Sequence, residues 1–156
     1  MAKLYLARHA KAGERRLWEG DDVHRPLSPK GWKQAGLLAE RLAKLDVSTL
    51  HSSPYIRCVQ TLEPLAERLG RAIEIEPRLS EDEAVEPVFE LLAELPDGAV
   101  MSSHGDIIPA TMMALERRGT EIRTPPDWRK GSVWVLKRNK HGQIVHATVW
   151  PPPQLA

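Results

Sequence analysis

The stretch of sequence from residue 3 to residue 9 reads KLYLARH. Its first five residues form a short apolar run of the kind that builds a buried strand. Two basic side chains, Arg8 and His9, follow directly where this strand should end. Ligands of α/β proteins usually bind at the carboxyl ends of the strands. The stretch therefore predicts a buried first strand that delivers Arg8 and His9 to a candidate site.

Predicted helices and strands alternate along the rest of the chain. Apolar spacings of three and four predict helices from Ser28-Pro29 to Leu45, from Ser53-Pro54 to Gly70, over 88–95, and from Asp106 toward Gly119. Short apolar or β-prone runs predict strands at 3–7, near Leu50, and at 73–75, 99–101, 132–137 and 144–150. The last two runs should pair as a hairpin because Asn139 and Gly142 favour a turn between them. This alternation predicts a layered α/β domain with a largely parallel sheet.

The length and composition of the chain narrow its class. Its 156 residues suffice for one globular core, so we expect a single domain over 1–156. The 22 basic and 21 acidic residues leave a net charge of +1, which argues against a nucleic-acid binder or a polybasic membrane-surface protein. The first apolar stretch is too short for a signal peptide or a membrane span. The single cysteine, Cys58, cannot form an internal disulfide, which favours a cytoplasmic location.

Three of the predicted strand ends carry residues suited to phosphate chemistry. Arg8 and His9 follow the first strand, Arg57 lies after the second, and His104 follows the fourth. A guanidinium can bridge two oxygens of a phosphoryl group, and an imidazole can attack phosphorus near neutral pH. The remaining cations and the second imidazole can stabilise the charge of the transition state. This scheme requires no metal and no other cofactor.

Four short blocks occur in a fixed order: LARHA at 6–10, RPLSPKG at 25–31, SSP at 52–54 with Arg57, and SHG at 103–105. Together they resemble the motifs of the histidine phosphatase superfamily, the phosphoglycerate-mutase-like proteins. The short chain and the run from Arg8 to Ala12 are most similar to the small SixA-like phosphohistidine phosphatases. They are also similar to the phosphatase domain attached to some Nudix hydrolases.

This resemblance implies a three-layer α/β/α sandwich with a largely parallel central sheet. It also implies that His9 becomes phosphorylated, that Arg8, Arg57 and His104 surround the phosphoryl group, and that water then hydrolyses phospho-His9. The resemblance favours a phosphohistidine protein as substrate, with a nucleotide or dinucleoside polyphosphate as the alternative. A non-catalytic module that binds a phosphorylated ligand is an alternative of another class.

The proton donor for the leaving group is left open by the sequence. Relatives that act on phosphate esters use a carboxylic acid in a Leu-x-Glu loop, and Leu79-Ser80-Glu81 matches this pattern. Glu81 is therefore the candidate, with Asp82 and Glu83 as neighbouring alternatives. All three acids could instead be solvated residues that favour a helix N-terminus.

Three further cations, Lys11, Arg15 and Arg16, follow the proposed nucleophile closely. They could bind additional phosphates or an acidic substrate surface, and Lys11 and Arg15 are the candidates. They could equally belong to a solvated loop. The sequence therefore predicts them as candidate substrate-binding residues beside the catalytic set.

Overall fold

The structure is a computed structural model that describes residues 2–155. Its strands are β1 (Ala2–Arg8), β2 (Leu50–Ser52), β3 (Ile73–Ile75), β4 (Val100–Ser103), β5 (Glu121–Ile122), β6 (Val133–Arg138) and β7 (Ile144–Trp150). Its α-helices are α1 (Pro29–Leu42), α2 (Ile56–Leu69), α3 (Glu86–Glu94) and α4 (Ile107–Arg117). Three short 3₁₀ turns accompany them: η1 (Arg15–Leu17), η2 (Asp22–His24) and η3 (Pro77–Leu79).

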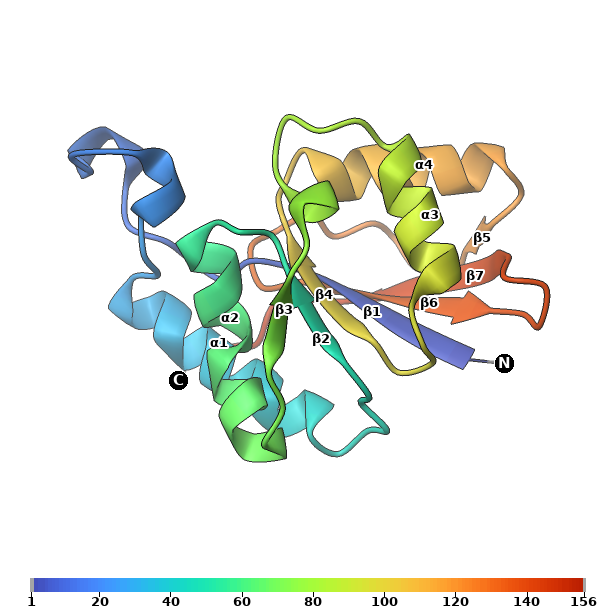
Figure 1. The fold of residues 1–156 in the computed structure, drawn as a ribbon, viewed down its shortest axis with the longest axis horizontal. Coiled ribbons are helices and arrows are strands. Elements are labelled where there is room, and N and C mark those ends of the chain that lie inside the picture. Colours follow the sequence, from blue (N-terminus) through green and yellow to red (C-terminus); the bar gives the residue numbers. More distant parts are fainter. Residues whose placement is uncertain (1, 156) are drawn as a thin grey trace.

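The strands form one sheet in the order β3-β2-β4-β1-β6-β7-β5. Neighbours from β3 to β1 are parallel, as are β7 and β5, whereas β6 is antiparallel to both β1 and β7. Figure 1 shows α1 and α2 on one face of the sheet and α3 and α4 on the other. The predicted three-layer α/β/α sandwich with a largely parallel sheet is thereby confirmed.

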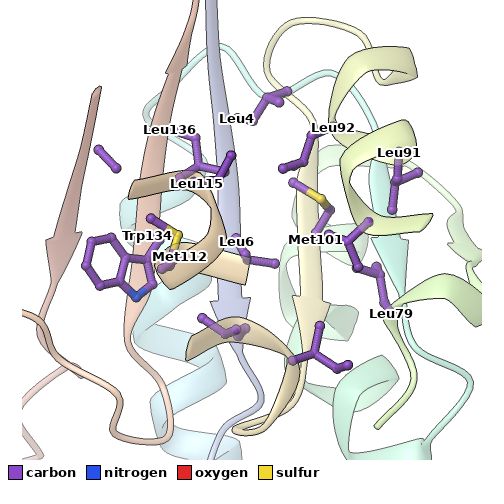
Figure 2. Packing of buried hydrophobic residues seen from close by; sticks show 14 of the residues in the cluster. Leu4, Leu6, Leu79, Leu91, Leu92, Met101, Met112, Leu115, Trp134 and Leu136 are labelled. Atoms are coloured by element: carbon purple, nitrogen blue, oxygen red, sulfur yellow. The ribbon is translucent and has the colours of Figure 1, made fainter. Parts of the chain in front are cut away.

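The side chains of β1 divide between the two faces because successive strand residues point in opposite directions. Leu4 and Leu6 pack under α3 and α4, while Tyr5 and Ala7 pack under α1 and α2. Figure 2 shows Leu4 and Leu6 among the leucine and methionine side chains that pack between the sheet and helices α3 and α4. A fully buried leucine contributes about 2 kcal/mol relative to an exposed one. The central strand is therefore held from both sides, which keeps its end in place.

The register of the sheet brings three strand ends to one edge. Arg8 at the end of β1 pairs with Ser103 at the end of β4, and Ser102 pairs with Ser52 at the end of β2. The functional residues that follow these strands consequently start from neighbouring points. This arrangement confirms the prediction that the strand-to-helix junctions gather at one edge.

The start of α1 agrees with the sequence, but the start of α2 does not. Ser28 caps α1, since its side chain accepts the N–H of Gly31. The prediction that Ser53-Pro54 caps α2 is wrong, because α2 begins at Ile56 after Tyr55. The hydroxyl of Ser53 instead lies 2.8 Å from Nε2 of His104. The same hydroxyl accepts the N–H of Tyr55 at 3.3 Å, so Ser53 holds the turn before α2 and also contacts His104.

Several other boundaries can be compared with the predictions. Gly70 ends α2 with a φ of 64°, and the predicted hairpin forms between β6 and β7 with Gly142 at a φ of 80°. Leu45 is outside α1 and 36% exposed, so the prediction that it belongs to the buried helical stripe is wrong. The sequence did not predict β5, whose two residues are too few to show a periodicity. None of the helices among residues 2–155 is long and apolar enough to cross a membrane.

Candidate active site

A cleft of about 610 Å³ opens at the edge where β1, β2 and β4 end. Every candidate residue taken from the sequence lines it: Arg8, His9, Lys11, Arg15, Arg57, Glu81 and His104. Residues 2–155 contain no group of three His, Cys, Asp or Glu side chains placed to hold a metal ion. The structure thus brings together residues from segments that are about 100 positions apart in the chain.

His9 is a buried, neutral imidazole with one free ring nitrogen. Its Nδ1 lies 2.8 Å from the carbonyl oxygen of Ala10, and because a carbonyl only accepts, Nδ1 carries the proton in this hydrogen bond. Burial is the main reason that the pKa of His9 lies well below its ordinary value; the hydrogen bond to Ala10 raises this pKa, and the charges of Arg57, His104 and Arg8 lower it. Nε2 therefore keeps its lone pair, which is the state a nucleophile requires.

His104 stands beside His9 as the second buried imidazole. The two rings are 5.7 Å apart between centroids and meet edge to face, and Tyr55 packs edge-on against His104 at 4.7 Å. Ser53 contacts Nε2 of His104, while Nδ1 lies 3.6 Å from Oε2 of Glu81. This contact with Ser53 fixes the orientation of the ring, so Nδ1 is turned toward Glu81.

Cys58 also touches His104, with its Sγ 3.5 Å from Nε2. A cysteine beside a histidine is an alternative nucleophile when its thiol ionises. Burial raises the pKa of Cys58 to about 12 and its side chain is fully buried. Cys58 is therefore held as a thiol and packs as a core residue.

Arg57 is the most deeply buried cation of the cleft, with a side chain that is 1% exposed. Its Nη1 donates to the backbone oxygen of Asp22 at 3.0 Å. Its Nη2 lies 3.1 Å from Oδ2 of Asp22 and 3.3 Å from Oε2 of Glu81. Its Nε is buried without a hydrogen-bond partner among residues 2–155. Two carboxylates therefore balance this guanidinium and keep it in the cleft.

The structure distinguishes Glu81 from its two acidic neighbours. The Glu81 side chain is 20% exposed and contacts both Arg57 and His104. Asp82 and Glu83 are exposed, and neither forms an ion pair with another described residue. Asp82 adopts a left-handed φ of 64°, a conformation that Asp tolerates better than most residues, so the chain turns sharply just after Glu81. Of the three acids, Glu81 and Asp82 line the cleft, and Glu81 is the one that contacts Arg57 and His104.

Arg8 lies against the backbone of the second histidine motif. Its Nη1 donates to the carbonyl oxygen of Trp128 at 2.7 Å. A Cβ added at Gly105 would lie 2.6 Å from Cζ of Arg8, so only glycine leaves room for the guanidinium there. The Nε of Arg8 is buried and has no hydrogen-bond partner among the described residues. This orphaned donor is available to an oxygen of a bound anion.

Lys11 and Arg15 lie at the rim of the cleft and are both exposed. Arg15 is 68% exposed, and its Nη2 lies 3.6 Å from Asp22 and 3.9 Å from Glu81. The backbone N–H of Lys11 is held by the side chain of Gln34 at 2.9 Å, whereas its ammonium has no carboxylate partner among residues 2–155. The two cations thus differ, since Arg15 faces acids of the protein and Lys11 does not.

Several residues that line or support the site were not among the candidates from sequence, including Asp22, Arg25 and Lys130 as well as Glu14 and Asp106. Asp22 binds Arg57 and also accepts from Nε of Arg25 at 2.8 Å. Arg25 donates to the carbonyl oxygen of Gly13 as well, which ties the loop before α1 together. Lys130 enters from the segment before β6. Arg25 belongs to the quoted block at 25–31, but no local pattern marks Asp22 or Lys130.

The protonation of His104 should couple stability to pH. Burial, followed by the charge of Arg57, lowers the pKa of His104 from 6.5 to about 4. Between these two pKa values, His104 binds a proton in the unfolded chain but not in the folded protein. The free energy of unfolding therefore falls as the pH decreases from 6.5 toward 4. We expect His104 to lower the free energy of unfolding by about 1 to 2 kcal/mol between roughly pH 7 and pH 5.

Urea unfolding at a series of pH values measures this effect. His9, whose pKa is lowered in the same direction, adds to the total, so the variant His104→Gln isolates the contribution of His104. The variant should lose stability less steeply than the parent between these pH values. Equal slopes for the two proteins would contradict the assignment.

Comparison with known proteins places these residues in a family context. Residues 4–84 match the histidine phosphatase superfamily (branch 1). The 8-oxo-(d)GTP phosphatase of Mycolicibacterium smegmatis is 35% identical over 157 residues, which cover 96% of this chain and 48% of that protein. The probable phosphoglycerate mutase GpmB of Enterobacter sp. (strain 638) is 36% identical over 84 residues, or 52% of this chain and 38% of that protein. The chain spans about half the length, or less, of these curated relatives.

Solved structures share the architecture over nearly the whole chain. The protein histidine phosphatase SixA complexed with tungstate has a TM-score of 0.75 and 24% identity, covering 95% of this chain and 94% of that one. A mycobacterial glucosyl-3-phosphoglycerate phosphatase complexed with VO₃ has a TM-score of 0.70 and 19% identity, covering 98% of this chain and 100% of that one. At these identities the likeness concerns the fold. The family match over residues 4–84, more than half of the chain, goes further and confirms the expected assignment: the chain belongs to the histidine phosphatase superfamily.

Proposed function

We propose that this chain is a phosphatase that passes a phosphoryl group first to Nε2 of His9 and then to water. The observation that carries the proposal is the state of His9, a buried neutral imidazole whose Nδ1–H is engaged by Ala10 and whose Nε2 is free. It lines a cleft that also contains the guanidinium groups of Arg8 and Arg57. A nucleophile beside cations is the arrangement that phosphoryl transfer requires.

In the first step, Nε2 of His9 forms a bond to phosphorus as the bond between phosphorus and the leaving-group oxygen breaks. The imidazole gains positive charge, which the Nδ1 hydrogen bond to Ala10 helps to stabilise. Arg8, Arg57 and His104 are proposed to stabilise the charge on the phosphoryl oxygens. In the second step water attacks phosphorus, Nε2 leaves, and inorganic phosphate is released.

Glu81, in its protonated form, is proposed to give its proton to the leaving group in the first step and to take up the proton of the attacking water in the second. Its carboxyl group contacts Arg57 and His104 and lines the same cleft as His9. Proton donation matters more for a poor leaving group than for a good one. Glu81→Gln should therefore lower kcat/KM about 100-fold for phenyl phosphate and less than about 5-fold for p-nitrophenyl phosphate.

Asp82→Asn is the matched control for this prediction, because Asp82 also lines the cleft but its carboxylate is exposed and forms no ion pair among residues 2–155. Its kcat/KM should stay within about 3-fold of the parent for both substrates. Equal losses for the two substrates in Glu81→Gln would exclude proton donation as its role. A leaving-group-dependent loss in Asp82→Asn would transfer that role to Asp82.

The two substrate classes expected from the sequence differ in their support. A phosphohistidine protein is favoured by the likeness to SixA, which at 24% identity concerns the fold. A nucleoside polyphosphate is favoured by the 35% identity to the 8-oxo-(d)GTP phosphatase, which extends over 96% of this chain. We therefore place the nucleoside polyphosphate first and retain the phosphohistidine protein as the second candidate.

A panel of substrates tests the proposal and its two branches together. Phosphate release is measured from 8-oxo-dGTP, dGTP, a histidine-phosphorylated carrier domain and glucose 6-phosphate, with the His9→Ala variant as the blank. The proposed order predicts the highest kcat/KM for a nucleotide. The highest value for the phosphorylated carrier would favour the second candidate, and no release from any substrate beyond the His9→Ala blank would refute the proposed function.

A further inference from the structure

Lys130 reaches the cleft from a part of the chain that no family motif covers. The segment before β6 runs beside the end of β1, where Gly131 N–H donates to the Arg8 carbonyl oxygen at 3.2 Å and Arg8 N–H donates to the Ser132 carbonyl oxygen at 3.0 Å. These backbone contacts hold the segment next to the residue that precedes His9. The side chain of Lys130 is partly buried and lines the cleft.

The charges of the cleft are unevenly balanced. Three of its cations lie within 4.0 Å of the carboxylates of Asp22 or Glu81, namely Arg15, Arg25 and Arg57. Three others have no carboxylate at that distance among residues 2–155, namely Arg8, Lys11 and Lys130. The carboxylates of Glu14, Asp82 and Asp106 also line the cleft, but none of them lies within 4.0 Å of these three cations. Arg8, Lys11 and Lys130 are therefore left without a direct ion pair among the described residues.

The environment of Lys130 is unfavourable for a cation unless an anion binds. Burial lowers the pKa of Lys130, and the repulsion of four neighbouring cations lowers it further. Those cations are Arg8, Arg25, Arg57 and Lys11. An ammonium that is partly desolvated and surrounded by like charges gains most when an anion takes up its free donors.

We infer that Lys130 and Lys11 form a second anion subsite beside the phosphoryl group at His9. The inference rests on the proposed function and specifies its substrate class: a compound in which the transferred phosphoryl group is joined to at least one further phosphate. The charge of that next phosphate lies against Lys130 and Lys11, while Arg8 and Arg57 serve the phosphoryl group that is transferred. A monoester with a neutral remainder leaves the subsite empty.

Binding of two non-hydrolysable probes tests this subsite without relying on turnover. Methylenediphosphonate carries two phosphonate groups and methylphosphonate carries one, and isothermal titration calorimetry gives their Kd values. Lys130→Met should weaken methylenediphosphonate about 10-fold and methylphosphonate less than about 3-fold, because the lost partner is an ammonium that meets the second group. Lys130→Arg should restore diphosphonate binding to within about 3-fold of the parent.

Lys140→Met is the matched control, since Lys140 is exposed at the turn between β6 and β7, away from the end of β6 that pairs with Ala7. It should leave both Kd values unchanged. Equal weakening of the two probes in Lys130→Met would assign Lys130 to the transferred phosphoryl group and overturn the second subsite. Unchanged diphosphonate binding, or no diphosphonate binding to the parent, would also overturn it, whereas the proposed function fails separately if phosphate release does not depend on His9.

Discussion

His9→Ala is expected to lower kcat for p-nitrophenyl phosphate by at least ~1000-fold, because the variant lacks the atom that accepts the phosphoryl group. The neighbouring cations remain, so KM should change far less than kcat. The loss reflects chemistry and not binding, since Arg8, Arg57 and His104 still line the cleft. Steady-state kinetics with a coupled assay for phosphate measures both constants.

His51→Ala provides the matched control for this prediction. His51 is also a buried histidine, but it lies on β2 with its Nε2 2.7 Å from Oγ1 of Thr49 and does not line the cleft. Its removal should leave kcat within about 3-fold of the parent. Retention of more than about a tenth of parental kcat in His9→Ala, with the same thermal unfolding as the parent, would remove His9 from the reaction path.

Arg57→Gln is expected to reduce kcat/KM by about 100- to 1000-fold and to destabilise the fold by about 2 kcal/mol. The catalytic loss follows from removing a buried charge proposed to stabilise the transition state. The loss of stability follows because Asp22 and Glu81 both contact Nη2 of Arg57, and each would lose this cationic partner. Arg25 and Arg15 still contact these carboxylates, which keeps the structural cost moderate.

Arg68→Gln removes the same charge from the same helix at an exposed position. Arg68 lies 3.8 Å from Glu40, and both side chains are more than half exposed. Such a pair contributes at most about 1 kcal/mol, so this variant should match the parent in kcat/KM and nearly in stability. If Arg57→Gln retained parental kcat/KM while its urea midpoint fell, Arg57 would be a structural residue only.

Much of the fold and the clustering of the site could be predicted because local patterns and one topological rule act together. The apolar run before Arg8 specifies a buried strand, and parallel strands deliver the residues that follow them to a common edge. This rule predicts that Arg8, His9, Arg57 and His104 lie close together, and the structure places all four in one cleft. Their chemical roles remain predictions that the variants above test.

The residues that sequence reasoning missed depend on contacts between distant segments. Lys130 reaches the cleft because β6 runs antiparallel to β1, so the start of β6 lies at the end of β1, and residue order alone does not reveal this pairing. Asp22 sits in a one-turn 3₁₀ segment with no apolar periodicity. Ser53 does not cap α2, which begins at Ile56, and its hydroxyl contacts both the N–H of Tyr55 and His104, which is 51 residues away. In each case the position of the residue depends on a contact with a distant segment, and the local sequence pattern does not reveal that contact.

Detection of the phosphorylated intermediate tests whether His9 accepts the phosphoryl group. The parent protein is quenched during turnover of p-nitrophenyl phosphate, and the phosphorylated peptide is located by mass spectrometry under alkaline conditions. We expect an acid-labile, alkali-stable phosphoramidate on His9 that is absent from His9→Ala and still forms in His51→Ala. An acid-stable adduct on another residue, or turnover with no adduct on His9, would contradict it.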